Sequence, residues 1–376
     1  MTRHDYLAPA PAEEQKMILD TVADLARDLV APMAAKIDED GAMPLELHEA
    51  LAESGLLAIA IAEEDGGSGF DQQSRVLALA ELASASGGCA LHLWNQGILG
   101  LETLVAAGGK TEFVQNVAMG EASLALAWFE AGDHLDPAAC DTVFENGRID
   151  GTKVRVLGGD QADFFCVVAR EGDAASLFLL PADRSGLQRG DPARRMGMRP
   201  VGAADVVLNG VAVGDEDRLG QAGAAGTILS RVMVCARLGL AAIGAGIARA
   251  ARDEATRYAS ERVQFGRPIA ELQAVQERLS RTEEAWSGSI ALAMTAARLL
   301  DAGEDAAQVA RLAYVRAAES ALVAADDALQ VFGGYGYSRE YPVERIYRDA
   351  RYLGCALGGV DRARLEIARA ILPKPN

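Results

Sequence analysis

The most informative stretch of this chain is Gln330-Val-Phe-Gly-Gly-Tyr-Gly-Tyr-Ser-Arg-Glu-Tyr-Pro-Val-Glu-Arg-Ile-Tyr-Arg-Asp-Ala-Arg351. Its paired glycines, Gly333 and Gly334, can turn the chain. The segment that follows is Tyr352-Leu-Gly-Cys-Ala-Leu-Gly-Gly-Val-Asp361. The side chain of Leu357, in the middle of this segment, cannot accept a proton, so this position offers no general base.

The last third of the chain, which contains this stretch, has a helical pattern. One long helix is predicted from Ala224 to Arg262, ended by Gly266 and Pro268, and three further helical segments follow. Four long antiparallel helices form a bundle, here over residues 222–376. The glycines of Gly239-Leu-Ala-Ala-Ile-Gly-Ala-Gly246 resemble a weak nucleotide-binding pattern. They lie inside the predicted helix and not at a strand-to-helix turn, so we interpret them as sites of close helix packing.

The first two thirds divide near residue 121. Residues 1–120 alternate helical stretches with breaks at Gly or Pro, and the first helix is predicted over Glu13–Val30, ending near Pro32. Short β-leaning runs separated by turn signals then extend to about residue 215. These runs are Leu124–Phe129, Asp141–Glu145, Phe164–Ala169, Ser176–Leu180 and Ala204–Leu208. We therefore predict a mainly α protein with a central β domain: an all-α domain (1–120), a small antiparallel barrel or sandwich (121–215) and a four-helix bundle (222–376).

The composition limits the kinds of partner. The chain has 376 residues, of which 50% are hydrophobic and 5% aromatic, in keeping with an Ala/Leu-rich helical protein. It carries 36 basic and 54 acidic residues, a net charge of −18. This balance argues against nucleic acid or an anionic membrane as the main partner. A small anionic ligand is not excluded, because it needs only a local basic pocket.

The same sequence predicts a cytoplasmic protein without a metal site. The N-terminal residues lack the apolar core of a signal peptide, and the most apolar stretch, Val232–Ala251, carries Arg237 and Arg249. The five cysteines are scattered without metal-type spacing, which suggests reduced thiols.

Three motifs closely resemble the acyl-CoA dehydrogenase family, and the resemblance covers most of the chain. The first is the stretch 330–351. The second is Glu63-Glu-Asp-Gly-Gly-Ser-Gly69, similar to the family's N-terminal loop. The third is Asp253-Glu-Ala-Thr-Arg-Tyr-Ala-Ser-Glu-Arg-Val-Gln-Phe-Gly-Arg-Pro-Ile269, similar to its long-helix signature. The resemblance implies a helical, β, four-helix order and an FAD held at a dimer interface.

In this family one subunit donates contacts to the pyrophosphate and adenosine of its neighbour's FAD. The resemblance carries these contacts over to six residues of this chain. Arg262 and Phe265 match an Arg-x-x-Phe-Gly element, Gln273 matches the glutamine beyond it, and Gln330, Gly333 and Gly334 match the adenosine-side turn. Each also has a purely structural interpretation, as a solvated helix end or a turn.

The half of the site that holds the flavin ring in the same subunit departs from the family pattern. Phe129-Glu130-Ala131 replaces Thr-Glu-Pro, and Arg155-Val156-Leu157 replaces Trp-Ile-Thr, which removes hydroxyls and a stacking indole. The position of the family's catalytic Glu is Leu357, and the alternative base position on the long helix is Ala236. Neither residue can remove the α-proton of an acyl thioester. Whether Phe129, Arg155 and Leu157 close the flavin site or reshape it stays open at this point.

The residues that would contact a neighbour's FAD match the family pattern, whereas those that would hold the flavin ring in the same subunit do not. This difference predicts a non-catalytic subunit. The family includes heteromeric α2β2 dehydrogenases, particularly in actinobacterial sterol and acyl-CoA catabolism, in which one subunit lacks the base. This chain resembles such a subunit, which implies FAD shared with a Glu-bearing paralogue, an acyl-CoA ligand and a tetrameric assembly for α,β-desaturation. Two alternatives remain: a homo-oligomeric flavoprotein of different chemistry, such as a reduced-flavin monooxygenase, and a flavin-free binding protein on the same scaffold.

Overall fold

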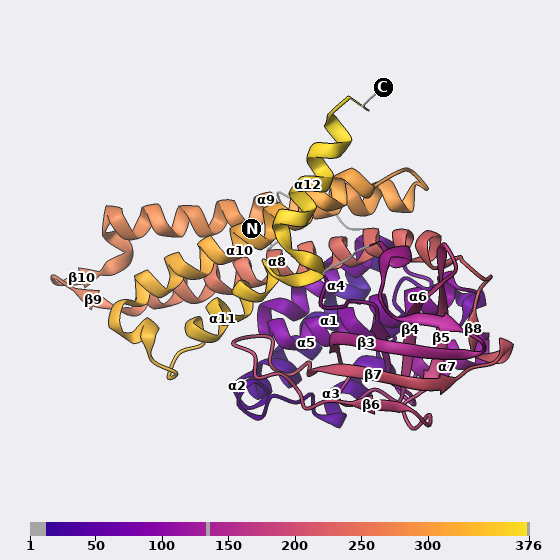
Figure 1. Ribbon diagram of the computed structural model, residues 1–376. Helices are drawn as coiled ribbons and strands as arrows, with labels where there is room; N and C mark the ends of the chain where they lie inside the picture. The colour runs from indigo at the N-terminus through magenta and orange to yellow at the C-terminus, as the bar shows by residue number, and fades with distance from the viewer. Residues whose placement is uncertain (1–12, 133–135, 374–376) are drawn as a thin grey trace.

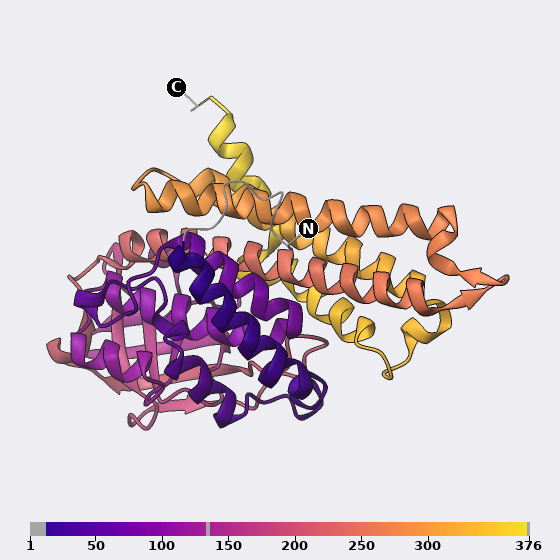
Figure 2. The same cartoon turned by 180° about the vertical axis from the view of Figure 1, so that it is seen from behind.

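The computed structural model describes residues 13–132 and 136–373. In this part of the chain, helices come first, a sheet follows, and long helices complete the fold (Figure 1). The expected fold, mainly α with a central β domain, is confirmed. Figures 1 and 2 both show the N-terminal helices and the sheet together on one side of the long C-terminal helices.

The N-terminal part does not stop its first helix at Pro32, as the sequence predicted. α1 (Glu13–Leu25), a π-helical segment η1 (Ala26–Val30) and α2 (Ala31–Asp40) follow one another without a break. Pro32 closely follows the π-helical segment η1, which interrupts the regular α-helical hydrogen bonds at the point where proline lacks its N–H. The remaining helices are α3 (Leu45–Glu53), α4 (Gln72–Ala85), α5 (Gly87–Trp94), the π-helical η4 (Asn95–Glu102), α6 (Thr103–Ala106) and α7 (Thr111–Ala118).

The central part is one sheet, and it is mixed where an antiparallel one was expected. Its strands are β1 (Leu124–Ala127), β2 (Val143–Glu145), β3 (Arg148–Leu157), β4 (Phe164–Glu171), β5 (Ala174–Pro181), β6 (Leu187–Arg189), β7 (Ala203–Ala212) and β8 (Arg218–Leu219). The order is β6-β7-β3-β2-β4-β5-β8, and β1 and β2 both pair with β4 in parallel. β1 follows a helical domain and not a neighbouring strand, so no hairpin forces it to run antiparallel.

The C-terminal part is built on α8 (Ala225–Glu261), α9 (Gln273–Asp301) and α10 (Ala307–Phe332), followed by α11 (Val343–Leu353) and α12 (Gly359–Ile371). The predicted long helix is thus present almost as expected. A short hairpin, β9 (Val263–Gln264) and β10 (Arg267–Pro268), joins α8 to α9 and projects beyond the rest of the molecule (Figures 1 and 2).

Helix α8 is the centre of the core, which explains its glycines and its apolar composition. A Cβ on Gly246 would lie 2.2 Å from the carbonyl oxygen of Ala80, and one on Gly239 would lie 2.4 Å from Trp94. The glycines of 239–246 therefore permit close packing against α4 and α5, as predicted. Within the described residues, α8 is also the one helix long and apolar enough to cross a membrane, but 78% of its apolar window is buried inside the protein.

Candidate functional site

A cavity of about 560 Å³ lies where the sheet, α5 and the segment after α11 meet; we call it the central cavity. Its lining includes both the family base position and the substituted flavin-side residues. The described residues that line it are Trp94, Leu99, Leu126, Phe129, Glu130, Ala131, Val154, Arg155, Val156, Leu157, Arg195, Tyr352, Cys355, Ala356, Leu357 and Gly358.

Leu357 lies at the wall of the central cavity and is buried. Its backbone is left-handed, with φ 52° and ψ 41°, a conformation that costs a non-glycine residue of the order of 1–3 kcal/mol. The segment is thus held in an unusual conformation that turns position 357 toward the cavity, although the side chain there has no proton acceptor.

Ala236, the alternative base position, lies beside the same cavity. Its side chain is fully buried, and its carbonyl oxygen accepts a hydrogen bond of 2.8 Å from Nε1 of Trp94, a cavity residue. The next residue, Arg237, forms a 2.8 Å ion pair with Glu366 of α12. Neither base position has a carboxylate of its own, and the nearby Glu366 is held by arginines.

The carboxylate that does line the central cavity, that of Glu130, is fully engaged in structure. Oε1 accepts hydrogen bonds from Lys153 Nζ at 2.6 Å and from the backbone N–H of Thr142 at 3.0 Å, and Oε2 accepts from the N–H of Asp141. Burial alone would raise the pKa of Glu130, but the hydrogen bonds from Lys153 and Thr142 outweigh it and hold the pKa below its ordinary value. Glu130 is therefore a poor candidate for a general base.

The substituted residues line the cavity and leave it open. The ring of Phe129 stacks on Trp128, with centroids 5.3 Å apart and planes 22° from parallel. Arg155 has a positive φ of 50°, and Leu157 is half-buried at the end of β3. Because about 560 Å³ remains between these side chains, they reshape the site and do not fill it.

The residues predicted to serve a neighbour's cofactor lie at the opposite end of α8, around the projecting hairpin. Arg262, Gly333 and Gly334 line one open pocket of about 460 Å³, together with Tyr258, Gln264, Ile269, Val331, Phe332 and Tyr335. The guanidinium carbon of Arg262 lies 5.4 Å from the ring centre of Tyr335. Gly333 has φ 59° and ψ −134°, a combination that favours glycine. We call this the hairpin pocket.

The other three predicted cofactor residues are exposed around the hairpin pocket and do not line it. Phe265, at the hairpin turn, has an 88% exposed side chain. Gln273 begins α9, and Gln330 lies in the last turn of α10; both are exposed. The structure thus brings three of the six residues into one pocket and leaves the other three on the surface nearby.

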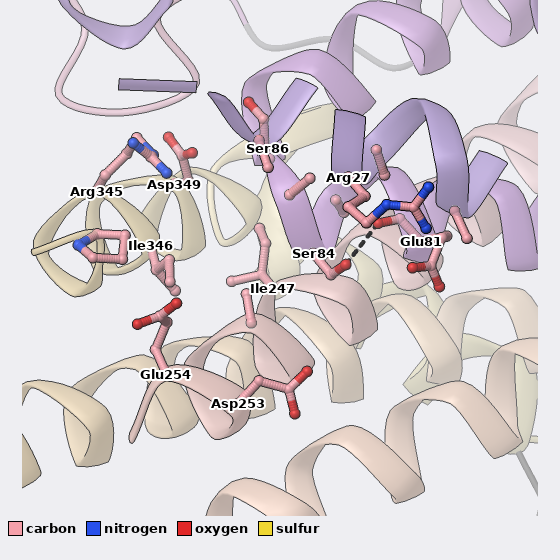
Figure 3. Close-up of a pocket in the computed structure, with 18 residues that line it drawn as sticks. Arg27, Glu81, Ser84, Ser86, Ile247, Asp253, Glu254, Arg345, Ile346 and Asp349 are labelled. Atoms are coloured by element: carbon pink, nitrogen blue, oxygen red, sulfur yellow. Dashed lines mark hydrogen bonds between the residues drawn. The ribbon is translucent and has the colours of Figure 1, made fainter. Parts of the chain in front are cut away.

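A further cavity of about 560 Å³ contains none of the predicted site residues. It lies between α1, α4, α8 and α11, and Figure 3 shows Arg345 and Asp349 on one side with Arg27 and Glu81 on the other. Asp349 is buried and accepts a hydrogen bond from the N–H of Met198. Burial raises the pKa of Asp349 to about 6. We call this the α11 cavity; Arg27 and Glu81 in its wall are held in ion pairs, and its described polar residues include no evident reactive pair.

Sequence analysis missed three residues that shape the central cavity: Lys153, Arg195 and Tyr352. Lys153 lies in β3, a strand that was not predicted, because its sequence interrupts the β pattern with Gly151 and charged side chains. The burial of Lys153 comes from its pairing with Glu130 on another segment, and the sequence of β3 gives no signal of it. Arg195 lies in a connecting segment, and no local pattern indicates that it reaches α11.

Comparisons with known proteins agree with this architecture. The family model described as the N-terminal domain of acyl-CoA dehydrogenase matches residues 12–121, and the model of the C-terminal domain matches residues 226–372. The 3-(aryl)acrylate reductase of Clostridium sporogenes is 32% identical over 96% of this chain and 99% of its own length. The benzylmalonyl-CoA dehydrogenase of Aromatoleum aromaticum is 33% identical over 96% of this chain and 98% of its own.

Among solved structures, the butyryl-CoA dehydrogenase of Megasphaera elsdenii superimposes with a TM-score of 0.92 at 27% identity, covering 97% of this chain and 99% of that chain. The similarity therefore extends over the whole helical, β and helical arrangement. This chain belongs to the acyl-CoA dehydrogenase family of oxidoreductases.

Proposed function

We propose that this chain is a non-catalytic subunit of an acyl-CoA dehydrogenase, which completes the FAD site of a Glu-bearing paralogue. The assembly would carry out α,β-desaturation of an acyl-CoA as a cytoplasmic α2β2 tetramer. One observation carries the proposal: Leu357 occupies the base position in a cavity whose described lining has no free carboxylate, whereas the hairpin pocket is open and keeps Arg262.

The residues of the hairpin pocket fit the pyrophosphate side of FAD. A diphosphate needs a cation and an accessible approach, and Arg262 lies half-exposed at the wall of an open pocket. The largely exposed rings of Phe265 and Tyr337 lie nearby on the same projecting end. Two exposed aromatic side chains at one end are typical of a surface covered by another subunit.

The residues of the central cavity do not fit the flavin ring in the manner of the family. Among the described lining residues, only Tyr352 carries a hydroxyl group, and no Ser or Thr is present. The indole N–H of Trp94 already donates a hydrogen bond to the carbonyl oxygen of Ala236. FAD supplies hydride transfer when bound, and we place that step in the partner. This chain would contribute the charge of Arg262 and the surface of the hairpin.

A second candidate function is a homo-oligomeric or flavin-free protein that binds a small molecule in the central cavity. The open volume of that cavity favours it, because a purely structural subunit would have no need of such a space. Expression of the chain alone separates the heteromer from the homo-oligomeric flavoprotein. We expect well under one FAD per chain by absorbance at 450 nm, whereas a yellow homotetramer with one tightly held FAD per chain would refute the heteromer.

The proposal is tested by substituting Arg262 in a complex co-expressed with the paralogue that carries Glu at the position of Leu357. Arg262→Ala removes a charge-assisted bond worth about 1.5–3 kcal/mol. FAD occupancy and the desaturation rate should fall together, by about tenfold or more, although the change lies in the subunit without a base.

Arg257→Ala is the matched control. Arg257 lies one turn earlier on α8, and its ion pairs are with Glu254 and Glu261 of the same helix. It should leave FAD occupancy unchanged. Full FAD occupancy and activity in the Arg262→Ala complex would show that Arg262 is a surface charge only.

A further inference from the structure

The central cavity has an excess of positive charge. Its ionisable lining includes Arg155, Arg195 and Glu130. Glu130 is neutralised by Lys153, which lies behind it in β3. Within residues 13–132 and 136–373, neither Arg155 nor Arg195 forms an ion pair with a carboxylate; Asp160 and Asp349 act on Arg195 only from a greater distance. Two guanidinium groups of the cavity therefore make no direct ion pair with a described carboxylate.

Arg195 is the more informative of the two because it is largely withdrawn from water. Its Nη2 donates a 2.7 Å hydrogen bond to the carbonyl oxygen of Met198, and its guanidinium carbon lies 5.4 Å from the ring centre of Tyr352. Its Nη1 is buried and makes no close hydrogen bond within the described residues, although the Tyr352 side chain interacts with the guanidinium and favours its charged form. Burial lowers the pKa of Arg195 below its ordinary value. A buried cation with an unsatisfied donor costs free energy that an anionic ligand would recover.

The rest of the wall is apolar. Its larger apolar side chains are those of Trp94, Leu99, Leu126, Phe129, Leu157 and Leu357. A doubly charged phosphate would need several more donors than this wall offers, whereas a carboxylate is satisfied by one planar guanidinium and a few further contacts. The volume of about 560 Å³ is in the range of small-molecule sites.

We propose that the central cavity binds a free organic carboxylate with an apolar or aromatic body. The carboxylate would pair with Arg195 and the body would pack against Phe129 and Leu357. This site goes beyond the proposed function, because it requires neither FAD nor a partner. It makes the base-lacking subunit a ligand-binding protein in its own right.

The test is isothermal titration calorimetry on the full isolated chain with 3-phenylpropanoate and octanoate as probes. The matched neutral probes are 3-phenylpropanamide and octanamide. At least one carboxylate should bind about tenfold or more tightly than its amide, because only the carboxylate compensates the buried charge. Equal affinity of acid and amide, or no binding of either acid at millimolar concentration, would overturn the proposal.

Arg195→Gln keeps a donor for Met198 but removes the charge, so it should abolish the preference for the acid. Arg194→Gln, one residue earlier and exposed, should keep it. Leu157→Trp narrows the cavity and should weaken both probes, which locates the site if Arg195→Gln folds poorly. A preserved acid preference in folded Arg195→Gln would also refute the assignment. None of these readouts involves FAD, so their failure is distinguishable from failure of the Arg262 experiment.

Discussion

Lys153 Nζ lies 2.6 Å from Oε1 of Glu130, and neither side chain reaches solvent to more than 4%. Glu130 carries the one carboxylate in the described lining of the central cavity, and this ion pair keeps it from acting as a base. The pair also ties β3 to the loop after β1, because Nζ donates a second hydrogen bond to the carbonyl oxygen of Trp128. The same interaction that stabilises the cavity wall therefore leaves the described lining of the cavity without a carboxylate that could act as a base.

Lys153→Met should destabilise the protein by about 3 kcal/mol, because it leaves a buried carboxylate without its cation. Urea unfolding followed by circular dichroism measures this change. Lys110→Met, at an exposed lysine, should change stability by less than about 0.5 kcal/mol. Adding Glu130→Gln to Lys153→Met should recover part of the loss. Equal effects of the two lysine substitutions would contradict the role of the pair.

His48 and His92 should make the protein less stable below about pH 6.5. Their ring nitrogens lie 2.9 Å apart, and burial lowers the pKa of His92 to about 3 and lowers that of His48 as well. In the fold His92 stays neutral down to about pH 3 and His48 binds a proton less readily than usual, whereas in the unfolded chain both bind protons below about pH 6.5. Their stabilising effect is therefore complete above that pH and is lost as the pH falls.

For His92 this loss is about 1 kcal/mol at pH 5.5. Urea unfolding of wild type and His92→Gln at pH 5.5 and 7.5 isolates it: the pH-dependent loss should be smaller in the variant. If the free energy of unfolding fell equally with pH in both proteins, His92 would be protonated in the folded state.

Asp349→Asn should stabilise the protein at pH 7.5 and have little effect at pH 4.5. The pKa of Asp349 is raised to about 6 in the fold, so its carboxylate is charged and buried above that pH, and stability is lost as the pH rises through 6. Asparagine keeps an acceptor for the N–H of Met198. The expected gain is on the order of 2 kcal/mol at pH 7.5. Asp253→Asn, in the same α11 cavity but more exposed, is the control and should show no such pH-dependent gain.

Leu357→Glu should not convert this chain into a useful dehydrogenase. The new carboxyl group would lie in a largely apolar wall and tend to stay protonated, and the flavin would still lack its hydroxyl contacts. Anaerobic mixing of the FAD-supplemented variant with a panel of acyl-CoA thioesters, followed at 450 nm, tests this. Rapid bleaching by any of them would show that the central cavity still positions a flavin ring. Leu357→Gln controls for the change in shape.

The structure brings the residues predicted from sequence together only in part, and the reasons are local. Arg262, Gly333 and Gly334 line one pocket because each stands within a motif of contiguous residues and two helix ends bring these motifs together; their role in binding FAD stays a prediction. Arg195 and Lys153 were missed because their importance depends on partners far away in the chain. Pro32 was misjudged because a π-helical segment before it lets the helix continue.

The sequence by itself determined the helical, β, helical order, the long helix that became α8, and the absence of a base at positions 236 and 357. These follow from short-range periodicity, from glycine and proline breaks, and from residue identity. The tertiary structure alone decided that Glu130 is bound to Lys153, that Arg195 lies at the central cavity without an ion pair to any described carboxylate, and that the cavity stays open. Each of these depends on contacts between segments that are distant in sequence, and such contacts are set by packing and not by local pattern.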